Sequence, residues 1–74
     1  MNNKQYSLIK IGERIEFLKK EKGITNAYIS ENLNVSEQAV SKIITKLKNG
    51  KNCNLGTIIS VFDVLGVDFL KERL

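Results

Sequence analysis

Apolar residues recur along the first third of the chain at the spacing of an amphipathic helix, beginning at Leu8. Ser7 is placed to cap the start of this helix, and Gly23 can supply the left-handed residue that ends it. The pattern therefore predicts a helix over about 7–22. The polar residues before it, 1–6, are expected to be flexible.

The stretch from Thr25 to Lys48 predicts a short helix, a tight turn and a longer helix. Thr25 and Ser36 suit the two N-caps, and Asn34 tolerates the positive φ that such a turn needs. The apolar stripe of the longer helix continues through Leu47, so this helix is expected to end near Lys48. The residues expected to face inward in this pair are Ile29, Leu33, Val35, Val40, Ile43, Ile44 and Leu47.

A polar segment over 49–54 predicts a loop, after which Asn54 can cap a fourth helix that Gly66 ends. Asp68 is placed to cap a fifth, short helix over 69–74. The apolar stripe of the fourth helix comprises Leu55, Ile58, Ile59, Phe62 and Leu65.

The length of 74 residues suits a single small domain, residues 1–74, with a modest core. No apolar run approaches the ~20 residues that cross a bilayer, and residues 1–7 lack the apolar region of a signal peptide. We therefore expect a cytoplasmic protein without a membrane partner. The absence of histidine and the single cysteine, Cys53, exclude an internal disulfide and an ordinary zinc site. No catalytic set is recognisable, so we expect neither enzyme activity nor a cofactor.

The net charge of +4 is unevenly distributed. Residues 1–24 and residues 36–51 each carry +3, whereas residues 25–35 and residues 52–74 each carry −1. Positive charge on the first and third helices suits a polyanion, although a lysine-rich solvated surface would give the same count. Short helices joined by a tight turn, with a hydrogen-bonding outer face on the second, are typical of proteins that read DNA.

The segment 11–43 resembles the DNA-binding domain of lambda-type phage repressors, Cro proteins and their Xre-like bacterial relatives. The most specific part is the G-I-T-N sequence at 23–26, and the resemblance resumes at 49–51 and over 55–70. The residues at family spacing after this opening are Ile29, Leu33, Val35, Ser36, Val40 and Ile43. The resemblance implies a five-helix, all-α, lambda-repressor-like domain that binds double-stranded DNA through its third helix.

The chain departs from this family after Ile43. Ile44 stands where the family usually has a glutamate, and Lys19 stands where its arginine partner falls. Four extra residues, about one helical turn, precede Gly50. We infer a third helix extended by about one turn, with apolar packing in place of the buried ion pair.

The resemblance also implies which residues touch DNA. The positions that read base edges are Glu37, Gln38, Ser41 and Lys42. Lys46 lies outside the family pattern and could add a phosphate contact. The family positions that contact phosphates are Asn26, Ser36, Thr45, Asn49 and Lys51. The inserted turn displaces the last two, and a solvated polar surface is the alternative interpretation of all of them.

These features favour a transcriptional regulator of the repressor, Cro, controller or antitoxin type, acting as a homodimer on a palindromic operator. Dimerisation is expected through the fourth and fifth helices, because the C-terminal third holds more apolar residues than one stripe can bury. These residues are Val61, Val64, Val67, Phe69 and Leu74. The alternative is a protein-binding adaptor built on the same fold, and the basic outer face of the third helix favours DNA.

Overall fold

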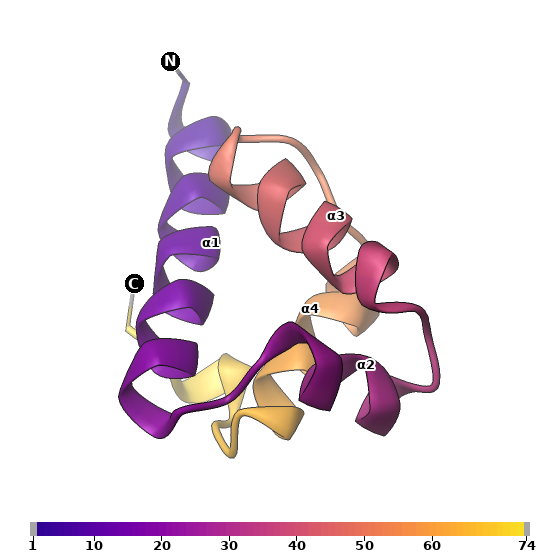
Figure 1. Cartoon of the computed structure of the whole chain (residues 1–74). Helices are drawn as coiled ribbons and strands as arrows, with labels where there is room; N and C mark the ends of the chain where they lie inside the picture. The colour runs from indigo at the N-terminus through magenta and orange to yellow at the C-terminus, as the bar shows by residue number, and fades with distance from the viewer. Residues whose placement is uncertain (1, 74) are drawn as a thin grey trace.

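The computed structural model describes residues 2–73, and every regular element in this range is helical. Four α-helices are followed by one three-residue 3-10 helix (Figure 1). The elements are α1 (Asn3–Lys22), α2 (Asn26–Leu33), α3 (Glu37–Lys48), α4 (Leu55–Val64) and η1 (Phe69–Lys71). The predicted all-α class is confirmed, whereas the predicted count of five helices is wrong.

The segment expected to form the fifth helix is reduced to η1. Asp68 caps it as predicted, because its Oδ1 accepts a hydrogen bond from Leu70 N at 3.0 Å. The backbone is already extended at Glu72, so the turn does not continue into an α-helix. So few residues make too few intrahelical hydrogen bonds to offset the cost of helix nucleation. Leu74 lies outside the described residues.

The helices enclose one apolar core. α1 runs along one side of the molecule, and α3 leans towards it so that the C-terminal end of α3 meets the N-terminal half of α1 (Figure 1). α2 packs against α3 and α4, and η1 packs against α4. The buried apolar residues are Leu8, Ile11, Ile15, Leu18, Ile29, Val40, Ile44, Leu47, Ile58, Val61, Phe62 and Leu65.

The first helix begins earlier than the sequence predicted. Asn2 rather than Ser7 is its N-cap: Asn2 Oδ1 accepts a hydrogen bond from Gln5 N at 2.8 Å. Gln5 Oε1 accepts one in return from Asn2 N at 3.1 Å, which completes a capping box. The apolar stripe starts only at Leu8, so periodicity alone missed this polar first turn. The predicted end is confirmed, since Gly23 adopts a left-handed conformation with φ 65°.

The predicted extension of the third helix to Lys48 is confirmed. Its added turn is part of the core, because Leu47 is fully buried. α1 accommodates this turn at Gly12, where a Cβ would lie 2.8 Å from Lys48 N and 3.1 Å from Leu47 C. Gly50, with φ 74°, similarly sits against Gln5, whose Cβ would be 3.2 Å from a Cβ at Gly50. The early start of α1 and the late end of α3 therefore pack against each other.

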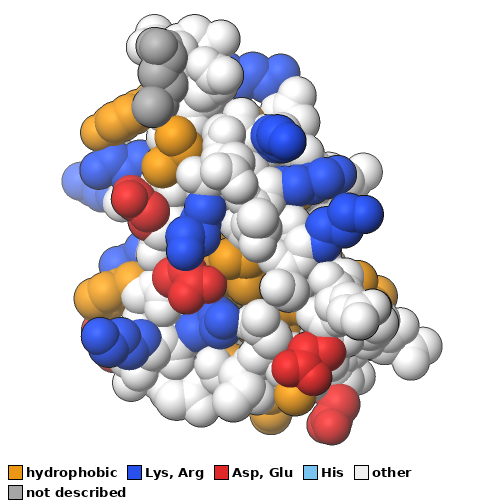
Figure 2. All heavy atoms as spheres, turned by 45° about the horizontal axis from the view of Figure 1, so that its top comes forward, with side chains coloured by type: hydrophobic (Ala, Val, Ile, Leu, Met, Phe, Trp, Pro, Cys, Tyr) orange, Lys and Arg blue, Asp and Glu red, His pale blue; other side chains and the backbone are white. Residues whose placement is uncertain are grey.

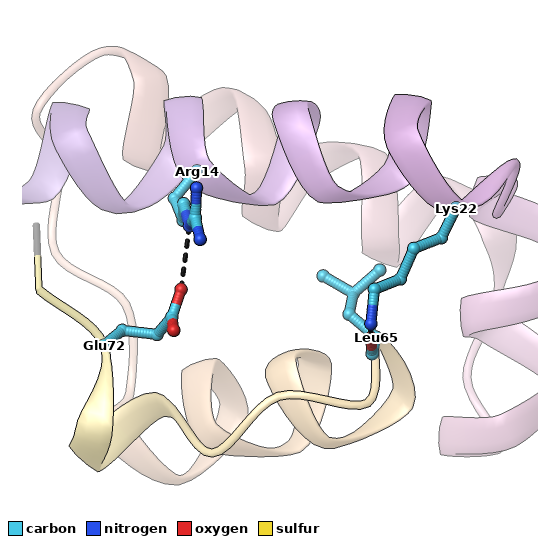
Figure 3. A network of polar contacts seen from close by, with 4 residues as sticks. All are labelled: Arg14, Lys22, Leu65 and Glu72. Carbon is cyan, nitrogen blue, oxygen red and sulfur yellow. Dashed lines mark hydrogen bonds and ion pairs between the residues drawn. The ribbon is translucent and has the colours of Figure 1, made fainter.

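Two polar contacts attach the C-terminal segment to α1 (Figure 3). Arg14 Nε donates a hydrogen bond to Glu72 Oε1 at 2.7 Å, and the two groups also form an ion pair. Lys22 Nζ donates to the backbone oxygen of Leu65 at 2.7 Å, at the C-terminal end of α4. The ammonium thus lies where the negative end of the α4 dipole favours a cation.

Several predictions of burial need correction. Val35 is 44% exposed because it lies in the turn between α2 and α3, and Leu55 is 56% exposed because it opens α4 beyond the edge of the core. Val61, counted as surplus apolar surface, is fully buried. Phe69 is half-buried, with its ring centroid 4.9 Å from that of Phe62.

No helix within residues 2–73 is long and apolar enough to span a membrane.

Candidate nucleic-acid interface

The tight turn between α2 and α3 is built by three polar residues. Thr25 Oγ1 accepts a hydrogen bond from Tyr28 N at 3.1 Å and starts α2. Asn34 ends α2 with φ 58°, and within residues 2–73 it is the one non-glycine residue with positive φ. Ser36 Oγ then accepts from Ala39 N at 3.0 Å and starts α3. The two N-caps and the left-handed turn residue predicted from sequence are therefore confirmed.

Apolar and small side chains hold the two helices together behind this turn. Ile29 of α2 and Val40 of α3 are both fully buried. Ser30 is only 7% exposed, and its hydroxyl donates to Ala27 O at 2.7 Å, so its polar group is satisfied within α2. Because the inner face of α3 is committed to the core, its outer face is fixed relative to α2.

The four predicted base-reading residues all lie on that outer face, in the first two turns of α3. Each is exposed to solvent. Within residues 2–73, none of their side chains takes part in an intramolecular hydrogen bond or ion pair. These residues are Glu37, Gln38, Ser41 and Lys42. The structure thus brings these side-chain donors and acceptors together on one exposed face of α3.

The predicted phosphate-contacting residues differ in whether their polar groups already form hydrogen bonds within the protein. Ser36 already uses its oxygen in the α3 cap, which leaves its hydroxyl hydrogen to donate. Asn49 donates from Nδ2 to Thr45 O at 2.9 Å, so one amide hydrogen of Asn49 is committed. Asn26 is half-buried, and its Oδ1 is buried without a partner among the described residues. Its Nδ2 is therefore the polar group left to donate outward.

The lysines of α3 fall on two edges of its outer face. Lys42 and Lys46 line a groove between α3 and the start of α4, together with Asn54 and Thr57. Lys48 lies on the opposite edge, against Gly12 of α1. Lys and Arg side chains gather at the upper right of Figure 2, over α3 and the loop that follows it. Exposed positive charge therefore flanks the four predicted base-reading residues.

Cys53 also lines this groove and is half-buried. Its thiol lies 3.7 Å from Ile43 O, within the range of a weak hydrogen bond involving sulfur. Ile43 is itself partly buried and packs against the core, as expected for an inward-facing residue at its edge. These contacts give Cys53 a packing role between α3 and the loop before α4.

Gly12 is the residue of this region that the sequence analysis missed. It touches no ligand surface, yet its missing side chain sets how closely α3 approaches α1. A signal was present, because a glycine inside a helical pattern costs about 1 kcal/mol relative to alanine and implies a close packing contact.

Residues 15–50 match the family described as winged helix-turn-helix DNA-binding. This segment runs from the middle of α1 through the end of α3 and is just under half of the chain. Neither the curated proteins nor the solved structures include a match to the chain. The family match supports a helix-turn-helix DNA-binding domain without singling out the lambda-repressor type. Since residues 2–73 contain no strand, the match concerns the helices and not a wing.

Proposed function

We propose that this protein is a sequence-specific regulator of transcription that binds double-stranded DNA through α3. The observation that carries the proposal is the exposed outer face of α3, where Gln38, Ser41 and Lys42 make no intramolecular bonds within the described residues. A helix of this width fits the major groove, and its first two turns are those that face base edges. A cytoplasmic repressor of the Cro, phage-repressor, controller or antitoxin type is the role that fits best.

Each base-reading residue has a partner that its chemistry favours. The amide of Gln38 can bond to adenine at two atoms, Lys42 can donate to guanine, and Glu37 can accept from cytosine. Ser41 can both donate and accept, so it is tolerant of the base it meets. The order of these residues along α3 would thus specify a short sequence of base pairs in the operator.

Phosphate contacts would position α3 in the groove. Lys46 and Lys51 are exposed cations on either side of the end of α3, and Thr45 is an exposed hydroxyl on its outer face. Asn26 lies in the first turn of α2, where backbone N–H groups favour an anion. Ser36 and Asn49 would each contribute their remaining hydrogen.

A homodimer on a palindromic operator completes the proposal, because one domain of 74 residues covers few base pairs. The two copies of α3 would then enter successive major grooves, ~34 Å apart. The C-terminal segment, expected to form the interface, offers Leu70, which is 74% exposed. Val61 is buried and Phe69 packs on Phe62, so substituting either residue would disturb the fold of the protomer. A substitution that tests this surface should therefore be made at Leu70.

The logarithm of the affinity for a selected operator should fall linearly with the logarithm of the salt concentration. Lysines that neutralise phosphates release counterions, and roughly four to eight contacts per dimer would give a log–log slope of about −4 to −7. Fluorescence anisotropy between 50 and 200 mM salt measures this slope. Binding that ignores salt, or failure to enrich any site from random DNA, would instead favour the protein-binding adaptor.

Base reading and phosphate binding should be separable by substitution on α3. Gln38→Ala or Lys42→Ala is expected to cost about 1–3 kcal/mol on the preferred operator and to relax preference at particular base pairs. Lys46→Ala, the matched control one turn away, should weaken binding to all sequences alike and reduce the salt slope by about one.

The measurement for these three variants is competition with every single-base change of the operator. If Lys46→Ala changed base preference while the other two lowered affinity uniformly, α3 would be rotated or shifted in the groove relative to the proposed docking.

A further inference from the structure

The outer face of α1 carries a second regular pattern that DNA binding does not use. Its residues recur at alternating spacings of three and four, which is the spacing of the seam between two packed helices. The members of this seam are Asn3, Tyr6, Lys10, Glu13, Phe17 and Lys20. All of them are solvent-exposed except Lys10, which is half-buried beside Tyr6.

Two exposed aromatic rings mark this seam as a contact surface. Tyr6 is 56% exposed and Phe17 is 51% exposed, so both leave apolar area in water. Each ring is partly covered by a cation of the same helix: Lys10 Nζ lies 5.4 Å from the centroid of Tyr6, and Arg14 Cζ lies 5.1 Å from that of Phe17. Hydrophobic, basic and acidic side chains alternate along the left edge of Figure 2, over α1.

The order of the seam residues is self-complementary. When a second α1 is laid antiparallel across a two-fold axis between Ile11 and Gly12, Tyr6 falls opposite Phe17 of the second copy. The same operation places Lys10 opposite Glu13, and each pairing occurs twice. A two-fold interface requires this kind of match, since the same surface must serve both partners.

The charged residues of the seam indicate which kind of partner binds to this face of α1. The six members of the seam carry a net charge of +1, from Lys10, Lys20 and Glu13, and Lys10 and Glu13 are the two that can pair with their counterparts on a second copy. On a second copy of the chain, a negative side chain already lies opposite Lys10 and a positive one opposite Glu13. We infer that a second copy of this chain docks antiparallel on the outer face of α1.

The C-terminal segment extends the same surface. Arg14 joins α1 to Glu72, and Arg73 lines a shallow hollow with Lys10 and Glu13. α1 is about 30 Å long, and a contact along one face of a single helix is small beside the ~800 Å² per partner of a standard interface, so we expect the dimer to be weak in free solution. This inference rests on the proposed function for its purpose, because DNA with two half-sites would complete the association, and it places the main dimer interface on α1 instead of on η1.

Charge substitutions on the seam test this interface in the absence of DNA. Lys10→Glu or Glu13→Lys places like charges opposite each other twice per dimer, so each should weaken self-association roughly 5- to 30-fold. The double variant K10E/E13K restores opposite charges and should recover most of the parent affinity. Lys4→Glu, the same change at an exposed position of α1 away from the seam, is the matched control.

Sedimentation equilibrium at protein concentrations up to roughly 1 mM gives the dissociation constants, and circular dichroism checks that each variant is folded. A parent that remains monomeric, or a double variant no better than the single ones, would overturn the inference. Self-association that survives Lys10→Glu but is lost in Leu70→Asp would also overturn it and would place the interface at η1.

The DNA-binding proposal is tested separately. Titration of a single half-site with the Lys10→Glu variant should give the parent affinity, since one copy suffices there. If the parent protein did not bind DNA, the proposed function would be refuted. The sedimentation result on self-association would be unaffected.

Discussion

Replacing Leu47 by alanine is expected to destabilise the fold by about 2–5 kcal/mol, the range for truncating a fully buried leucine. Leu47 has no solvent exposure and lies in the last turn of α3, facing α1. For a domain of this size, such a loss lowers the melting temperature by roughly 10–30 °C. Thermal unfolding followed by circular dichroism measures the shift.

Leu55→Ala is the matched control for Leu47→Ala. The same side chain is removed at a site that is 56% exposed, so the cost should stay within about 0.5 kcal/mol. Equal melting of Leu47→Ala and the parent would mean that residues 45–48 do not form a core-packed helical turn.

A Gly12→Ala substitution should lower stability by about 1–3 kcal/mol, although alanine is the better helix former. The added Cβ would lie 2.8 Å from Lys48 N, which belongs to the backbone and cannot swing aside. Relief requires α3 to move away from α1, so the variant should also bind DNA more weakly at temperatures where it is folded. Chemical denaturation and operator titration measure the two effects.

Ser7→Ala provides the contrast on the same helix. Ser7 is exposed, so alanine there should give the stabilisation of a few tenths of a kcal/mol that helix propensity predicts. If Gly12→Ala also stabilised the protein, the close approach of α1 to α3 would not exist in solution.

Local rules accounted for most of the fold. The caps at Thr25, Ser36 and Asn54 depend on a side chain and a backbone group a few residues apart, so the sequence alone predicted them. The left-handed residue at Asn34 likewise follows from its own conformational preference. The extension of α3 was predictable because Leu47 continued an existing stripe.

The failures share a different physical origin. The start of α1 depends on a capping box formed by Asn2 and Gln5, which no apolar pattern reveals. The burial of Val61 and the half-burial of Phe69 depend on how α4 and η1 meet the rest of the chain, and spacing along one helix does not determine that. Site residues on the outer face of α3 were predictable as exposed, but their DNA contacts depend on how α3 docks.

The contacts of Arg14 and Lys22 with the C-terminal segment have a consequence for the order of folding. They join residues 58 and 43 positions apart, whereas the contact between Ile43 and Cys53 spans 10. Closing the longest of these loops costs about 1.5 kcal/mol more entropy than closing the shortest. α2 and α3 can therefore assemble before the contacts of Arg14 and Lys22 form, and these two contacts then hold residues 65–72 against α1.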